Sequence, residues 1–315
     1  MSRVIAITGA AGYLGQHLIQ YLSQVSSDIE RFIALDIRDM IPPLDIPLDF
    51  YKIDVRDEFS FILEEHNVTD LIHMAWIINP IHNSKKAFQV DIDGTRNVLK
   101  QAHEAKIEYF LHTSSTLAYG AHSDNPYPLT ESSPLRGNKK FHYSYHKSIA
   151  EQIIDEFQEK NTNTMKIGKI RPSAILSPDL QNFVADILRG GWRTFFLLPF
   201  PNENTHIQFL HLEDALAGFK IMLDHRLTGP FNICPDTDVM VGQIPKIVKV
   251  RGVKGPLRTL KALLWVQWKL RVSRVPPTYL DFVAYPFVAT NRKIKELGYS
   301  PKYSTEEVLR FFTGI

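Results

Sequence analysis

Ser115, Tyr143 and Lys147 form a set of side chains whose types and spacing suit proton transfer. Tyr143 and Lys147 stand at positions i and i+4, which places them on one face of a helix. Free tyrosine has a pKa near ~10, too high for a general base at neutral pH, but an ammonium one turn away favours the phenolate. A hydroxyl such as that of Ser115 can bind the oxygen of a reacting carbonyl or alcohol. The set therefore predicts general acid–base chemistry at such an oxygen.

The segment Thr8–Gly15 (TGAAGYLG) predicts a glycine-rich turn between a strand and a helix. Glycine permits the tight turn and the close approach of a pyrophosphate, which the free N–H groups and the helix dipole favour. Asp36 ends the next apolar run, 21 residues after Gly15. A carboxylate there accepts hydrogen bonds from both ribose hydroxyls and repels a 2′-phosphate, so NAD(H) is favoured over NADP(H). Arg38 lies close by and partly opposes that repulsion.

Short apolar runs alternate with helical patterns through the first half of the chain, which predicts parallel β-α-β units. The fold class expected is α/β, a Rossmann-like doubly wound parallel sheet, with the active site at the carboxyl ends of its strands. The predicted strands are Arg3–Thr8, Arg31–Asp36, Phe50–Asp54, Asp70–Ala75, Glu108–Thr113 and Met165–Arg171, and the predicted helices are Gly12–Ser23, Ser84–Lys106 and Tyr143–Lys160.

Prolines interrupt this alternation after Arg171-Pro172 and predict a smaller C-terminal substrate lobe. We expect a dinucleotide-binding Rossmann domain over residues 1–172, rejoined by about 206–232. The substrate-binding lobe would then comprise residues 173–205 and 233–315.

Taken in order, these motifs resemble the extended short-chain dehydrogenase/reductase family, in particular its NAD-dependent epimerase/dehydratase group. The resemblance runs from Ser2 to about Gly298. Besides the glycine turn, the matching segments are Asp54–Asp57 (DVRD), His73–Trp76 (HMAW), Asp91–Leu99 (DIDGTRNVL), Ser114–Gly120 (SSTLAYG), Tyr143–Glu151 (YxxxKxxxE) and Phe209–Ala215 (FLHLEDA).

The resemblance implies that Tyr143 is the acid/base, that Ser115 holds the substrate oxygen, and that Lys147 binds the nicotinamide ribose and lowers the tyrosine pKa. Thr116 and Ala174 are implied as further substrate contacts. Asp91 replaces the family's usual asparagine, and a carboxylate there could pair with Lys147 instead of serving the proton relay. The implied cofactor-binding residues are Gly9, Gly12, Tyr13, Leu14, Gly15, Asp36, Asp54, Val55, Ala75, Trp76, Thr113, Tyr143, Lys147 and Pro172.

The substrate class is left open by the sequence. A nucleotide sugar is favoured by family frequency, yet Ala174 and Ile207 stand where such enzymes have an asparagine and an arginine, and a second phosphate-binding arginine has no counterpart near Tyr279–Pro286. Losing two cations forfeits charge-assisted hydrogen bonds to a diphosphate. The alternative is an apolar substrate, such as a lipid, a sterol-like molecule or an aromatic. A non-catalytic dinucleotide sensor is a third reading, opposed by the presence of both Tyr143 and Lys147.

The chain has 36 Lys+Arg against 34 Asp+Glu and a single cysteine, Cys234. A lone cysteine excludes an internal disulfide and suits a cytoplasmic, reducing location. Neither a membrane span nor a signal peptide is expected. The spacing of His142 and His146 is attributed to chance, so no metal is expected. The resemblance also implies a homodimer packed through helices 84–106 and 143–160.

The net charge of +2 is a balance between +9 in Val239–Leu280, which contains no Asp or Glu, and −7 elsewhere. Within this segment Leu257–Val272 predicts a helix with Leu260, Leu264 and Trp268 on one face. We expect that face to dock on the core and the basic face to meet solvent. Peripheral membrane contact through 257–272 is the alternative, and nucleic acid is not expected because no binding motif accompanies the charge.

Overall fold

A sheet of seven parallel strands forms the centre of the computed structural model, which describes residues 2–40, 45–161, 164–189, 196–200 and 202–314. The strand order is β11-β6-β5-β4-β1-β2-β3, so the order reverses at β1, which pairs with both β2 and β4. This confirms the Rossmann-like α/β fold. The strands are β1 (Arg3–Thr8), β2 (Ile29–Asp36), β3 (Leu48–Lys52), β4 (Asp70–His73), β5 (Tyr109–Thr113), β6 (Lys166–Pro172) and β11 (Gly229–Ile233).

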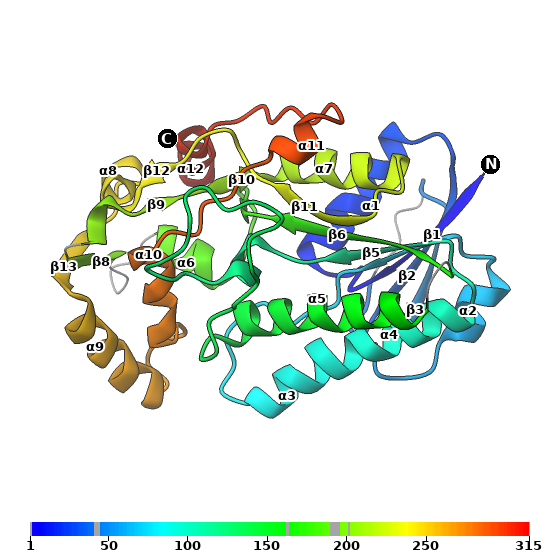
Figure 1. Cartoon of the computed structure of the whole chain (residues 1–315), viewed down its shortest axis with the longest axis horizontal. Helices are drawn as coiled ribbons and strands as arrows, with labels where there is room; N and C mark the ends of the chain where they lie inside the picture. The colour runs from blue at the N-terminus through cyan, green and yellow to red at the C-terminus, as the bar shows by residue number, and fades with distance from the viewer. Residues whose placement is uncertain (1, 41–44, 162–163, 190–195, 201, 315) are drawn as a thin grey trace.

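Helices cover both faces of this sheet (Figure 1). Alternation along β1 explains the two layers, because Ile5 and Ile7 belong to one hydrophobic cluster and Ala6 to another. The first cluster contains apolar side chains of α1 (Tyr13–Val25) and α7 (Leu212–Asp224). The second contains those of α2 (Ser60–Glu65), α4 (Gly94–Glu104) and α5 (His142–Lys160).

The helix predicted over Ser84–Lys106 is divided into three parts. α3 (Ser84–Phe88) leads into a π-helical turn, Gln89–Asp93, and α4 follows it. Such turns are rare and often lie at functional sites. Asp91, the residue that departs from the family pattern, lies within this turn and is fully buried.

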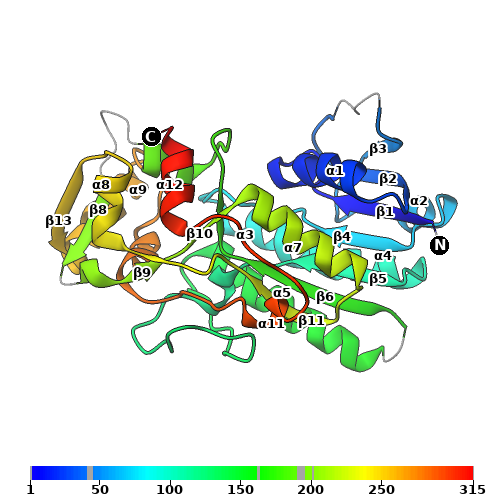
Figure 2. The same cartoon turned by 90° about the horizontal axis from the view of Figure 1, so that it is seen from above.

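The remaining elements lie mostly beyond one end of the large sheet (Figures 1 and 2). Three small two-stranded sheets join β7 to β10, β9 to β12 and β8 to β13. The division into two domains remains a prediction. Among the described helices, none has the length and apolar character needed to cross a membrane. The bounds are β7 (Ala174–Leu176), α6 (Phe183–Arg189), β8 (Phe196–Phe200), β9 (His206–Ile207), β10 (Phe209–His211), β12 (Val239–Met240), α8 (Ile244–Ile247), β13 (Gly252–Pro256), α9 (Leu257–Lys269), α10 (Asp281–Ala284), α11 (Arg292–Lys295) and α12 (Thr305–Thr313).

Candidate active site

The glycine turn lies at the carboxyl end of β1, where the strand order reverses. Gly9 has φ +75°, and a Cβ there would lie 2.7 Å from the Ala75 nitrogen. A Cβ on Gly12 or Gly15 would lie 2.9 or 2.7 Å from the Gly9 carbonyl oxygen. Since these obstacles are backbone atoms, only glycine fits at the three positions. The turn is therefore a compact cradle at the start of α1 that fits a dinucleotide pyrophosphate, and Tyr13 and Leu14 begin the helix that follows.

Asp36 ends β2 beside this turn, and its carboxylate is buried. It accepts the Ala11 N–H at 3.0 Å and the Arg38 N–H at 2.9 Å. The Arg38 guanidinium also donates to it, from Nε and Nη2, both at 3.2 Å. The acceptor expected for the ribose hydroxyls is thus in place, with a cation already next to it.

We expect an Asp36→Ser variant to bind NAD about tenfold or more weakly. Hydrogen bonds to a charged acceptor contribute about 1.5–3 kcal/mol, and serine keeps only a neutral hydroxyl. The NADP/NAD affinity ratio should rise, because the freed Arg38 can contact a 2′-phosphate. Fluorescence titration with both cofactors measures the ratio. Asp39→Ser, at an exposed carboxylate paired with Lys52 at 2.8 Å, is the matched control. An unchanged ratio would contradict the role of Asp36.

The structure brings Ser115, Tyr143 and Lys147 together where β5 meets α5. Ser115 follows β5, accepts the Leu117 N–H at 3.2 Å and donates to the Pro172 carbonyl at 3.4 Å. The Ser115 side chain also lies close enough to Tyr143 to lower the pKa of its hydroxyl. The Lys147 ammonium lies 5.9 Å from the Tyr143 ring centre and donates to the Thr113 carbonyl. Thr113 and Pro172 therefore contribute carbonyl groups that position Lys147 and Ser115.

Burial shifts the pKa values of both titratable groups away from the charged forms. Burial raises the pKa of Tyr143 to about 12, opposed by the hydrogen bond with Ser115. Burial lowers the pKa of Lys147 to about 7, opposed by the negative charges of Asp91 and Glu151. In this structure burial is the largest influence on the pKa of Tyr143, and the lowering that we expected from Lys147 is not found. A positively charged nicotinamide would favour the phenolate further.

The lowered pKa of Lys147 predicts a pH-dependent contribution to stability. Unfolded lysine retains its proton up to a pH near ~10.4, whereas the folded group loses it near pH 7. Between these values the unfolded state binds more protons, so the contribution of Lys147 to the unfolding free energy rises with pH and falls as pH drops toward 7. Urea unfolding at several pH values, for wild type and Lys147→Met, should show this difference. For the exposed Lys100, the difference in unfolding free energy between wild type and Lys100→Met should not change with pH. A Lys147→Met difference that does not change with pH would refute the lowered pKa of Lys147.

Trp76 covers the ammonium of Lys147. The indole centre lies 3.5 Å from the Lys147 nitrogen, which is a close cation–π contact. Among the described residues, the buried polar atoms without a hydrogen-bond partner include Trp76 Nε1 and Thr113 Oγ1, which belong to the two residues that contact the Lys147 ammonium. Such orphaned groups are normally satisfied by a ligand or ordered water. With the glycine cradle and Asp36, they fit a site for a dinucleotide.

Comparison with known proteins agrees with this geometry. A model of the NAD dependent epimerase/dehydratase family matches residues 5–234. The chain belongs to this family. It is therefore an NAD-dependent enzyme of the short-chain dehydrogenase/reductase type.

Relatives of this chain include both epimerases and dehydrogenases. UDP-glucose 4-epimerase of Erwinia amylovora is 27% identical over 250 residues, covering 70% of this chain and 73% of that protein. Mouse 3 beta-hydroxysteroid dehydrogenase type 7 is 23% identical over 355 residues, covering 96% and 93%. The NAD complex of Thermus thermophilus UDP-glucose 4-epimerase superposes with a TM-score of 0.74 at 17% identity, covering 99% of this chain and 98% of that one, which shows the shared fold.

Asp91 departs from the epimerase/dehydratase pattern in a way that the structure explains. Its carboxylate lies 2.8 Å from His146 Nδ1 and accepts the Ile77 N–H at 2.9 Å. The carboxylate therefore pairs with His146, and it affects Lys147 only through space.

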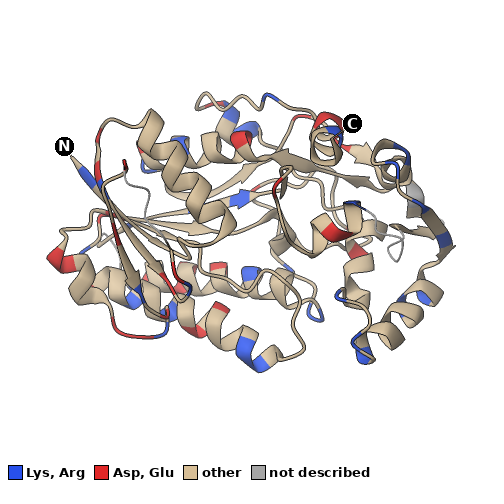
Figure 3. Cartoon of the chain, turned by 180° about the vertical axis from the view of Figure 1, so that it is seen from behind, with Lys and Arg blue, Asp and Glu red and all other residues tan. Residues whose placement is uncertain are grey.

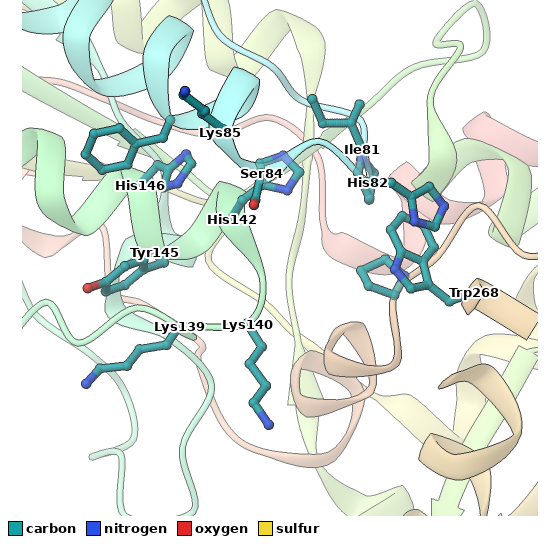
Figure 4. Close-up of a pocket in the computed structure, with 13 residues that line it drawn as sticks. Ile81, His82, Ser84, Lys85, Lys139, Lys140, His142, Tyr145, His146 and Trp268 are labelled. Carbon is teal, nitrogen blue, oxygen red and sulfur yellow. The ribbon is translucent and has the colours of Figure 1, made fainter. Parts of the chain in front are cut away.

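His142 and His146 both line a cavity of about 650 Å³ (Figure 4). Among the described residues, no group of three or more His, Cys, Asp or Glu side chains could hold a metal.

Glu151, the last residue of the YxxxKxxxE segment, forms a buried ion pair to which the sequence assigned no role. It accepts from Arg171 Nε at 2.8 Å and Nη2 at 2.6 Å. It also accepts from the Ser114 hydroxyl, next to Ser115, and Arg171 donates to the Tyr119 hydroxyl at 2.7 Å. These contacts tie α5 and β6 to the segment that contains Ser115.

The other predicted contact residues surround this centre at various distances along the sheet edge. Asp54 follows β3 and pairs with Arg56, whose hydrogen bond lowers the pKa of Asp54. Val55 next to it accepts from the Asn97 side chain through its carbonyl at 2.9 Å. The Tyr13 hydroxyl contacts Ser177 and Asp179. Ala174 lies on β7, half-buried against the cluster that Tyr143 also contacts.

Proposed function

We propose that this enzyme transfers a hydride between NAD and a secondary alcohol or its carbonyl. In the oxidative direction the substrate hydroxyl gives its proton to the Tyr143 oxygen, and the carbon that bears this hydroxyl loses a hydride. Bound NAD supplies the acceptor for that hydride. Ser115 holds the substrate oxygen, and Lys147 binds the nicotinamide ribose and stabilises the phenolate. The placement of Ser115, Tyr143 and Lys147 together at one sheet edge, next to the glycine cradle, carries the proposal.

We propose further that the substrate is apolar. A cavity of about 730 Å³ lies between α6, β8, α9 and residues 272–283, and most of its lining is apolar. The buried ring of Phe141 packs between this cavity and Tyr143, since its centre lies 6.3 Å from that of the Tyr143 ring and 6.4 Å from that of Phe183 in the cavity wall. Ile207 stands where nucleotide-sugar enzymes have an arginine. It is 6% exposed and belongs to the hydrophobic cluster that also contains Phe141 and Phe183. A sterol or lipid alcohol fits this setting better than a diphosphate.

The test is turnover of a panel of hydroxysterols, hydroxy lipids and UDP-sugars. Net NADH formation measures oxidation of an alcohol, and product analysis measures epimerisation, which returns the hydride and leaves no net NADH. We expect turnover with an apolar alcohol. Turnover with UDP-sugars alone would favour the nucleotide-sugar epimerase reading, which the similarity to UDP-glucose 4-epimerase supports. NAD binding without redox change on any substrate would favour a dinucleotide sensor.

An Ile187→Trp variant should raise the KM of the apolar substrate by about tenfold, because the half-buried Ile187 lines the cavity and the larger ring occupies its volume. The Kd of NAD should not change. Steady-state kinetics and cofactor titration separate the two effects. Ile221→Trp on α7, half-buried in another cluster, is the control. An unchanged KM would place the substrate elsewhere.

A homodimer and a cytoplasmic location also remain proposals. Phe88 on α3 is exposed, and Ile153 and Phe157 on α5 are partly buried, which suits a contact between copies through α3, α4 and α5. Size-exclusion chromatography with light scattering tests it. The buried thiol of Cys234 donates to the Ala289 carbonyl and is compatible with a reducing compartment.

A further inference from the structure

Helix α9 exposes an apolar stripe beside the face that docks on the protein. Leu260 and Leu264 are buried against Leu280, as the sequence predicted. Leu263 and Val266, three residues apart, are about half exposed, and Leu270, four residues on, is 69% exposed. Val272 extends the stripe at 74%. Spacings of three and four place Leu263, Val266 and Leu270 along one side of the helix, and none of the three belongs to a hydrophobic cluster of the described residues.

A basic stripe runs beside the apolar one. Arg258, Lys261 and Lys269 recur at helical spacing, and Trp265 lies among them with the Lys269 ammonium 5.1 Å from its ring. Lys261 pairs with Asp281, so its charge is partly balanced. Figure 3 shows α9 with basic segments and no acidic ones. The segment Val239–Leu280, to which the helix belongs, carries +9 and no acidic residue.

Trp268 does not contribute to the exposed stripe. Its ring stacks on His82 with centres 3.9 Å apart, at the edge of the cavity in Figure 4. This contact joins α9 to the loop before α3 and fixes the rotation of the helix. Trp265, in contrast, is 52% exposed within the basic stripe, and amphipathic aromatic rings of this kind are enriched at membrane interfaces.

The apolar stripe borders the cavity of about 730 Å³. Leu263, at 50% exposure, and Val272, at 74%, both line that cavity. The exposed surface and the cavity are therefore continuous at α9. A molecule dissolved in the acyl chains of a membrane on which α9 rests would reach the cavity with little exposure to water.

We propose that α9 and the residues up to Val272 dock on an anionic lipid surface. The apolar stripe enters the boundary of the acyl chains, and the cations of Arg258, Lys269 and Arg271 face the headgroups. Charge selects this occupant, because a membrane surface of negative phosphates complements a segment without carboxylates. Docking does not depend on the proposed hydride chemistry.

Sedimentation with vesicles tests the docking. At low ionic strength the full chain should bind vesicles of phosphatidylcholine mixed with phosphatidylglycerol and bind phosphatidylcholine alone much more weakly. Val266→Glu/Leu270→Glu should abolish binding, and Arg258→Gln/Lys269→Gln should weaken it by about tenfold or more. The tryptophan emission should shift to the blue on binding, and Trp265→Phe should remove most of that shift.

Matched substitutions elsewhere control for general effects. Phe61→Glu changes an exposed ring on α2, and Arg96→Gln/Lys100→Gln removes two exposed cations from α4; both should bind as wild type does. NAD affinity and thermal unfolding verify that each variant is folded. Absence of wild-type binding to the anionic vesicles, or equal binding by all variants, overturns the proposal. So does a change of Val266→Glu/Leu270→Glu to a smaller oligomer, since the stripe would then be a contact between copies.

Discussion

Tyr143→Phe is expected to lower kcat by about a thousandfold or more while the Kd of NAD stays within about twofold. Positioned general acid–base catalysis contributes about 10²–10⁴-fold, and the substitution removes the only group assigned to it. The phenyl ring retains the packing against Phe141, and Lys147 keeps its bond to the Thr113 carbonyl. Cofactor titration and single-turnover NADH formation on an accepted substrate measure the two quantities.

Tyr145→Phe is the matched control for this experiment. Tyr145 is on the same helix two residues later, but it lines the cavity that contains His142 and His146. Removing its hydroxyl should therefore leave turnover nearly unchanged. Full activity of Tyr143→Phe would refute the assignment of the acid/base, whatever the substrate. Loss of NAD binding in the same variant would show that the hydroxyl supports the cofactor rather than the reaction.

The central sheet could be predicted because buried parallel strands have a strong signal in the sequence. Arg3–Thr8 was predicted with the same bounds as β1, and Arg31–Asp36 falls within β2. Both are short apolar runs next to a turn, and their length and flanking residues favour a strand over a helix. The order of motifs then predicted where they would meet, since a strand end, a glycine turn and a Tyr-Lys helix come together only at one edge of such a sheet.

The interior of the active site could not be predicted, because its contacts join residues far apart in the chain. Trp76 occupies an alanine position of the family pattern, and only the fold reveals that its ring covers Lys147. Asp91 was expected to relate to Lys147, but the π-helical turn presents it to His146. The balance of burial against charge, which sets the pKa values of Tyr143 and Lys147, likewise requires coordinates.

At the predicted helix Leu257–Val272, the spacing of apolar residues predicts a helix but does not fully predict which of its faces are buried. Leu260 and Leu264 were predicted to dock on the core, and they do. The same pattern also contains Leu263, Val266 and Leu270, and a sequence does not reveal which of two apolar stripes is covered. The structure decides this through tertiary contacts, since Trp268 turns inward onto His82.

Glu151→Gln is expected to lower the free energy of unfolding by about 3–5 kcal/mol. Removing one partner of a buried ion pair leaves the other charge uncompensated in the interior. Two cations would be affected, because Lys169 lies 3.7 Å from Glu151 in addition to the bidentate Arg171, and all three side chains are buried. Urea unfolding monitored by fluorescence measures the loss. Glu306→Gln removes an exposed i,i+4 pair with Arg310 and should cause no measurable change.

The same variant should alter the dependence of stability on pH. The positive charge of Arg171 and its hydrogen bonds hold the pKa of Glu151 below its ordinary value despite burial. A carboxylate whose pKa is lowered on folding stabilises the protein above its unfolded pKa, near ~4.3, and that contribution is lost as pH falls through the folded value. The difference in unfolding free energy between wild type and Glu151→Gln should therefore be largest near neutral pH and shrink under acid. If this difference stays constant into acid, Glu151 acts through packing alone. A neutral carboxyl would then hold α5 and β6 together no less well than a charged carboxylate does.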